Sequence, residues 1–214
     1  KYENKVIAID EIQRNLKKKE AIVEFVVNEP IDTIHPGQLY RFIITKDDFD
    51  ISMENIDLEY VQQIEFMQKF LSSSNYLYTK KIDFINYCTS ANKLYNTLLA
   101  PVAGIISGKH LVIIPDDKLS YIPFDALISE MPDTTEMNFR TLKYLVYDYP
   151  ISYSYSSTLL FNFFETERSV SKKLLAFAPD YTYSEADKSS KKTKENLMPL
   201  PGAKLEVNSL NEYV

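Results

Sequence analysis

The sequence has 214 residues, of which 45% are hydrophobic, enough to form one large domain or two small ones. The formal net charge is −6 and the lysines are scattered, so the chain lacks the concentrated basic surface of a nucleic-acid-binding protein. No stretch approaches the roughly 20 apolar residues of a membrane span, and the first residues lack the apolar core of a signal peptide. We therefore predict no nucleic-acid partner and no membrane partner.

The chain contains one cysteine, Cys88, and two histidines, His35 and His110. One cysteine excludes an internal disulfide, and these three residues cannot assemble a structural zinc site. The composition is simplest to reconcile with a reducing cytoplasm, and we expect neither a metal nor another cofactor.

The first elements are predicted to be a short helix and two strands. Asp10 can cap a helix in which Ile12 and Leu16 share one face. Residues 21–27 and 39–44 are apolar and β-branched, which favours strands, and the turn-rich segment between them predicts an antiparallel hairpin with a long loop.

Two amphipathic helices are predicted next. Apolar residues recur every three or four positions from Asp57 to Leu71, and a serine-rich cluster follows. A second helix is predicted over residues 81–99, with Cys88 on its buried face. Pro101 should kink or restart the helix.

The segment from Leu111 to Leu127, LVIIPDDKLSYIPFDAL, is the most informative part of the sequence. Residues 111–114 form a continuous apolar run, which is typical of a strand buried on both faces. Residues 115–118 then predict a turn, after which Leu119 re-enters the core. Pro123 suits the first turn of a short helix whose apolar face carries Phe124 and Leu127.

Beyond this segment, residues 131–137 are predicted to form a loop. Residues 142–147 and 151–155 are rich in aromatic residues and predict two strands. Ser156 or Ser157 can cap a short helix. The apolar face of that helix would carry Leu159, Leu160, Phe163 and Phe164.

The last part of the sequence predicts a strand, a loop and a helix. Residues 173–178 have a buried-strand pattern, and residues 181–196 are strongly polar. Because this loop follows the carboxyl end of a strand, it could line a ligand site; the alternative is a solvated insertion. A helix is expected to start at Pro201 or Gly202. With no further strand before Val214 the α/β core would be incomplete, so we interpret the chain as a fragment of a longer protein.

These segments, in this order, resemble the CHAT domain, a caspase-like and separase-like cysteine peptidase module that usually follows tetratricopeptide repeats. The family hallmark resembles LYNTLLAPVAGIISGKHLVIIPDDKLSYIPFDAL. The residues at its marked positions are Pro115, Asp116, Leu119, Pro123, Phe124 and Leu127. Asp117 stands where glycine is common. The opening DEIQRNLKKKEAIVEF resembles the entry from the repeats, and YLVYDYPISYSYSSTLL, LLAFAPDY and LPGAKLEV resemble later segments, so the resemblance covers nearly the whole chain.

The resemblance implies an α/β fold: a caspase-like three-layer sandwich, incomplete, with an N-terminal α+β scaffold portion. Residues 1–170 would form the N-terminal, pseudo-caspase-like scaffold. Residues 171–214 would supply the first strand, loop and helix of the catalytic unit, in truncated form.

The resemblance also implies where catalysis would come from. Family members use a histidine followed by glycine and a cysteine, both downstream of the LPGAKLEV-type segment. His35 is followed by proline, His110 by leucine, and Cys88 precedes the hallmark, so none can be assigned a catalytic role. We predict no catalytic, cofactor-binding or metal-binding residue in this chain.

Two functions remain open. The chain could be the N-terminal half of a CHAT peptidase, with its own repeat domain, the missing C-terminal catalytic half and a peptide substrate of the parent protein as partners. Alternatively, it could be a non-catalytic interaction module that retains a peptidase-like fold. An α/β enzyme of another class has no support in the acids, bases, metal ligands or phosphate loops of this sequence.

Overall fold

The computed structural model describes residues 6–73, 80–162 and 201–209. The chain divides into two compact units, Lys1–Thr166 and Glu167–Val214, which we describe separately. Among the described residues, no helix is long and apolar enough to cross a membrane.

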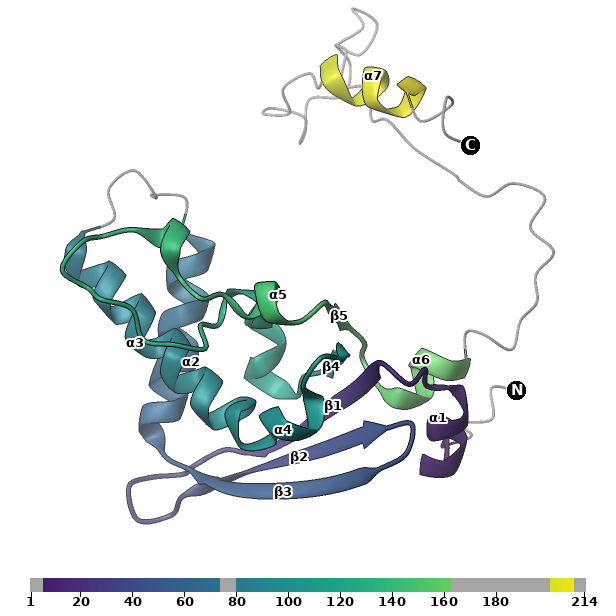
Figure 1. Cartoon of the computed structure of the whole chain (residues 1–214). Helices are drawn as coiled ribbons and strands as arrows, with labels where there is room; N and C mark the ends of the chain where they lie inside the picture. Colours follow the sequence, from purple (N-terminus) through teal and green to yellow (C-terminus); the bar gives the residue numbers. More distant parts are fainter. Residues whose placement is uncertain (1–5, 74–79, 163–200, 210–214) are drawn as a thin grey trace, which may run out of the picture. The chain divides into compact units, whose positions relative to one another are not determined.

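The described residues of the first unit form a five-stranded mixed sheet with the order β3-β2-β1-β4-β5 (Figure 1). The strands are β1 (Glu20–Asn28), β2 (Gly37–Thr45), β3 (Phe49–Ile56), β4 (His110–Ile114) and β5 (Ile151–Tyr153). β1, β4 and β5 are parallel, whereas β2 is antiparallel to both β1 and β3. The predicted hairpin and the strand in the hallmark are therefore confirmed, and β3 is an additional strand that the sequence analysis missed.

One face of the sheet is covered by α2 (Leu58–Ser72) and α3 (Lys81–Leu98). α2 begins as predicted, because the carboxylate of Asp57 accepts a hydrogen bond from the Tyr60 N–H at 3.0 Å. After α3 the chain continues through η2 (Ala100–Val102) and α4 (Ala103–Ile106), which is the restart expected at Pro101. This face holds the larger core, and Cys88 is fully buried in it.

The other face carries a smaller core, packed against α1 (Ile9–Asn15) and α6 (Ser157–Asn162). Its buried members are Ile12, Leu16, Ile22, Ile44, Val112 and Ile114. Apolar strand residues are thus buried on both faces of the sheet, which gives the layered α/β arrangement that the resemblance implied.

The predicted cap of α1 is wrong. The N-cap residue is Ala8, without a side-chain hydrogen bond, and Asp10 lies inside the first turn. There the Asp10 carboxylate forms an ion pair with Arg14 at 2.9 Å, one turn later. An acidic residue in the first turn is also favoured by the helix dipole, so its presence marked the helix start without identifying the cap.

The strand predicted over residues 142–147 is also wrong. Tyr144 forms one isolated bridge with Ile128, and the chain then turns into α5 (Leu145–Asp148), after the short η5 (Phe139–Thr141). Leu142 and Leu145 are the buried residues here, and their three-residue spacing is helical. The following predicted strand is confirmed in shorter form as β5.

The predicted cap of the next helix is confirmed. The hydroxyl of Ser156 accepts a hydrogen bond from the Leu159 N–H at 3.0 Å, at the start of α6. In the second unit, α7 (Pro201–Ser209) begins at the predicted proline. The predictions for residues 173–178 and 181–196, and for Phe163 and Phe164, lie outside the described residues.

Candidate functional site

The hallmark segment lies at the carboxyl end of β4, where the parallel strands β1 and β4 separate. Their pairing runs from Glu20↔His110 to Glu24↔Ile114. Pro115 then ends β4, whereas β1 continues to Asn28. The Asp116 carboxylate accepts a hydrogen bond from the Val27 N–H at 2.9 Å. Beyond the end of β4, the Asp116 side chain thus takes the place of the neighbouring strand. It accepts the hydrogen bond of the Val27 N–H, which would otherwise lack a partner.

The turn after Asp116 depends on an unusual backbone conformation. Asp117 has a φ of 45°, in the left-handed region where glycine is the usual residue. Aspartate tolerates this region better than most side chains. The turn brings Leu119 into the core within η3 (Asp117–Tyr121), which confirms the predicted return of the chain.

Lys118 connects this turn to two other elements. Its ammonium group lies 2.8 Å from Glu29, just beyond β1, and 3.8 Å from Glu65 on α2. The hydrogen bond to Glu29 is the main reason that the pKa of Lys118 is raised. Because the lysine side chain is 35% exposed, these pairs fix the position of the turn more than they add to stability.

The second half of the hallmark is attached to β5. Phe124 is buried in η4 (Phe124–Ala126), with its ring 5.5 Å from that of Phe25 and 6.3 Å from that of Tyr153. The Phe124 N–H donates to the Tyr153 hydroxyl at 2.8 Å, and that hydroxyl donates to Asp125 at 2.6 Å. Burial, followed by the hydrogen bond to Asp125, raises the pKa of Tyr153, so the phenol stays protonated. The hallmark therefore connects the ends of all three parallel strands.

Helix α3 supports the end of the hallmark and the residue that follows it. The Tyr87 hydroxyl donates to the Ala126 carbonyl at 2.6 Å, and the Asn92 amide donates to the Ile128 carbonyl at 3.2 Å. The carboxyl edge of the sheet is consequently held by side-chain hydrogen bonds to backbone groups, from α3 as well as from β5.

Cys88 lies in the middle of α3, on its buried face. Burial raises the pKa of its thiol to about 11. A thiol in this state is a poor nucleophile, because the thiolate is the reactive form.

The two histidines lie on other elements. His110 is the first residue of β4, at the end opposite the hallmark turn, and it lines a cavity beside α1 and α6. Cys88 belongs to the core on the other face of the sheet. The structure therefore does not bring these two residues together.

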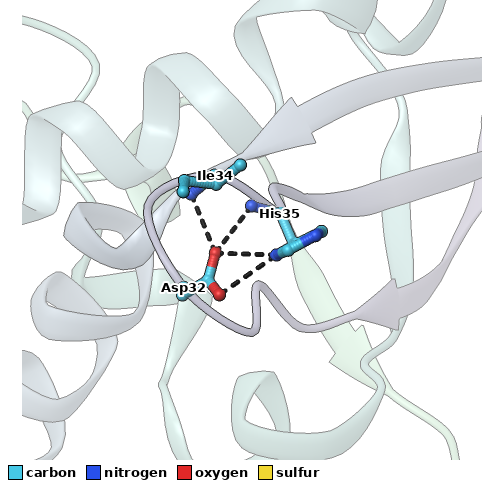
Figure 2. Close-up of polar contacts among 3 residues, drawn as sticks. All are labelled: Asp32, Ile34 and His35. Atoms are coloured by element: carbon cyan, nitrogen blue, oxygen red, sulfur yellow. Dashed lines mark hydrogen bonds and ion pairs between the residues drawn. The ribbon is translucent and has the colours of Figure 1, made fainter.

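His35 lies in the exposed β1–β2 loop and has a local structural role (Figure 2). One carboxylate oxygen of Asp32 accepts hydrogen bonds from the backbone N–H groups of Ile34 and His35, each at 2.8 Å. The His35 ring nitrogen Nδ1 lies 2.9 Å from the same oxygen. These interactions, with the His35 side chain contributing most, lower the pKa of Asp32. The geometry is that of an Asx turn closing a loop.

Arg41 is a buried charged residue that the sequence analysis did not identify. Its guanidinium group is 1% exposed on β2 and donates to the Ser52 hydroxyl and the Glu54 carboxylate on β3, and to the Thr97 carbonyl on α3. Arg41 lies between the buried Leu39 and Ile43 on the same face of β2, and this position within an apolar strand was the available signal. It attaches the outermost strand to the helical layer.

Within the described part of the chain, no group of three or more histidine, cysteine, aspartate or glutamate side chains could hold a metal ion. The geometry instead defines a structural site: a loop that fixes the relative positions of parallel strand ends, where ligand sites of open α/β sheets form.

Comparison with known families assigns this loop to a family domain. The family model of the CHAT domain matches residues 89–214, more than half of the chain and including the whole hallmark. The chain therefore belongs to the CHAT domain family, a group of modules related to caspase-like peptidases. The resemblance of residues 1–88 lies outside the matched range and stays a prediction. Among curated proteins, the sequence has no match.

Proposed function

We propose that this chain is the N-terminal half of a CHAT-domain cysteine peptidase and acts as the structural scaffold of its catalytic unit. The observation that carries this proposal is the hallmark loop, in which Asp116, Lys118 and Tyr153 connect the carboxyl ends of β1, β4 and β5. A catalytic pair on neighbouring strands needs a precisely placed support, because small displacements of reacting groups are costly in rate.

In the complete protein, catalysis would use a histidine and a cysteine outside this chain. The cysteine thiolate attacks the peptide carbonyl carbon, a thioester forms and the peptide C–N bond breaks. The histidine gives a proton to the departing amine and then takes one from the water that hydrolyses the thioester. The role of this chain is to fix the sheet on which these groups stand, and to link it to a repeat or sensor domain at the N-terminal side.

A second function is favoured by one observation. Strand β3 is the outermost strand of the sheet and carries exposed apolar side chains, which suits a non-catalytic protein-interaction module that keeps a peptidase-like fold. The two functions differ in whether a histidine–glycine pair and a cysteine follow in the parent sequence.

The test is to read the gene beyond the codon for Val214 and to assay the encoded protein on a peptide library. Under the proposal, the parent cleaves peptides, the chain ending at Val214 does not, and the Cys88→Ser parent retains full activity. Asp116→Ala should lower kcat while leaving the downstream cysteine reactive toward a small alkylating reagent. Loss of cleavage in the Cys88→Ser parent would overturn the assignment. A parent sequence without the downstream histidine and cysteine would favour the second function, a non-catalytic interaction module.

A further inference from the structure

Among the strands that the structure describes, β3 has an unpaired outer edge. In the β2–β3 turn, the Thr45 N–H donates to the Asp48 carbonyl at 2.9 Å, which marks these two residues as a hydrogen-bonded pair. Since such pairs alternate along an antiparallel ladder, the N–H and C=O groups of every second residue point away from β2. These residues are Phe49, Ile51, Met53 and Asn55. Among the described residues, no backbone hydrogen bond outside the strand ladders involves them.

The same edge is apolar on the face opposite α2 and α3. Ile51 is 50% exposed and Met53 is 54% exposed. In the register of the sheet, Ile51 lies beside Phe42, and Met53 lies beside Tyr40, which in turn pairs with the exposed Val26. An incoming strand would therefore continue an existing apolar surface.

The edge lacks two common protections against strand addition, lysine and proline. Residues 49–56 contain neither lysine nor proline, and the strand is eight residues long. The strand is also pre-organised, because buried Arg41 binds both Ser52 and Glu54. Binding to an already ordered edge costs less conformational entropy than binding to a flexible loop.

The charge around β3 indicates what kind of strand would bind. Residues 47–59 contain no lysine or arginine. Their carboxylates are Asp47, Asp48, Asp50, Glu54, Asp57 and Glu59. At the carboxyl end of β3 a cavity of about 300 Å³ is lined by three of these acids, Glu54, Asp57 and Glu59, together with Lys93, which is paired with Glu59. A second copy of this chain would bring acids to acids, whereas a basic segment would be attracted.

We propose that β3 binds an extended segment of a partner protein by strand addition, and that this segment alternates apolar residues with lysine or arginine. The partner backbone pairs with the outer edge of β3, its apolar side chains extend the surface of Ile51 and Met53, and its basic side chains lie on the side of Asp50. This binding site is independent of the scaffold role and of any catalysis.

The experiment measures binding of the whole chain to a fluorescein-labelled peptide of alternating lysine and valine, as long as β3, by fluorescence anisotropy. Ile51→Pro removes an outward N–H without touching the ladder to β2, so it should weaken binding about tenfold or more. The matched control Ile51→Thr keeps that N–H and should change the affinity by less than about threefold. Asp50→Asn should weaken binding and reduce its dependence on salt.

Two further peptides keep the test decisive if Ile51→Pro fails to fold. A fully N-methylated lysine–valine peptide cannot pair as a strand and should not bind. A glutamate–valine peptide should not bind either. Binding of the N-methylated or the acidic peptide with equal affinity, or no binding of the basic one, would overturn the proposal. Self-association in light scattering that Ile51→Pro abolishes would also overturn it, because the occupant would then be a second copy.

Discussion

The Asp116 carboxylate lies 2.9 Å from the backbone nitrogen of Val27 and accepts its hydrogen bond, although the two residues are 89 positions apart in the sequence. The bond forms where β4 has ended and β1 continues, so it replaces one rung of the parallel ladder. This relationship gives a physical reason for an aspartate directly after the strand and its proline in the hallmark.

Asp116→Ala should lower the free energy of unfolding by about 1–3 kcal/mol, because a half-buried N–H loses its acceptor. Asp116→Asn keeps an acceptor oxygen and should cost less than about 1 kcal/mol. Urea denaturation followed by far-UV circular dichroism can measure both, since the chain has no tryptophan to report by fluorescence. Equal losses in the two variants would mean that the hydrogen bond to Val27 is not the reason for the aspartate.

Substitutions at Asp117 test whether the left-handed backbone conformation of this turn limits which residues it accepts. Its φ of 45° is a conformation that β-branched residues strongly disfavour, so Asp117→Val should destabilise the fold by about 1–3 kcal/mol. Asp117→Gly removes the steric cost but adds freedom to the unfolded chain, so the free energy of unfolding should change by less than about 1 kcal/mol. The same denaturation measurement applies, with exposed Ser120→Val as the control for a β-branched residue within η3. A valine tolerated equally well at both positions would exclude a strained turn.

Substitutions at Arg41 and Glu54 test whether their ion pair stabilises the attachment of β3. Glu54→Gln leaves a buried guanidinium group without its ion partner, and Arg41→Met leaves the Thr97 carbonyl without its donor. Each single change should cost about 2–4 kcal/mol. The double variant should lose less than the sum by about 1 kcal/mol or more, because the two side chains interact directly. Strict additivity in this double-mutant cycle would show that the pair does not couple β3 to the helices.

The elements that could be predicted from sequence are those with one dominant signal. The regular apolar spacing from Leu58 to Leu71 and the run at 111–114 determine α2 and β4 almost without help from the rest of the fold. The strand prediction around Leu142 was wrong because the aromatic content of this segment favours a strand. Packing of Leu142 and Leu145 into the core selects a turn and a helix instead.

Strand β3 and the hydrogen bonds of Arg41 show a different limit of prediction from local sequence. The alternation in FDISMENI is a strand signal, but the sequence analysis made no prediction for this segment. The role of its polar residues depends on Arg41 in the neighbouring strand, and a contact between strands cannot be read from local spacing. The Asp116–Val27 bond was unpredictable for the same reason, although the resemblance to the family marked Asp116 itself.

Cys88 offers a test based on pH. Burial raises the pKa of its thiol to about 11 from an ordinary value of 9.0. The folded state therefore holds the proton more tightly than the unfolded state does, so the associated stabilisation is complete below about pH 9 and is lost as the pH rises toward 11. Cys88→Ala should cost about 1–2 kcal/mol near neutral pH, through lost packing, and this difference should shrink as the pH increases through that range.

The control for this prediction is built into the comparison. Buried Tyr60, whose pKa is also raised mainly by burial, titrates in both proteins, so its effect cancels in the difference between wild type and Cys88→Ala. Tyr87 does not cancel in this way, because the Cys88 thiolate contributes to its raised pKa. A thiol-reactive disulfide reagent should label the folded chain slowly near neutral pH and rapidly once urea unfolds it. Fast stoichiometric labelling of the folded chain, with no change on unfolding, would place Cys88 in an exposed and activated setting, contrary to its position in α3.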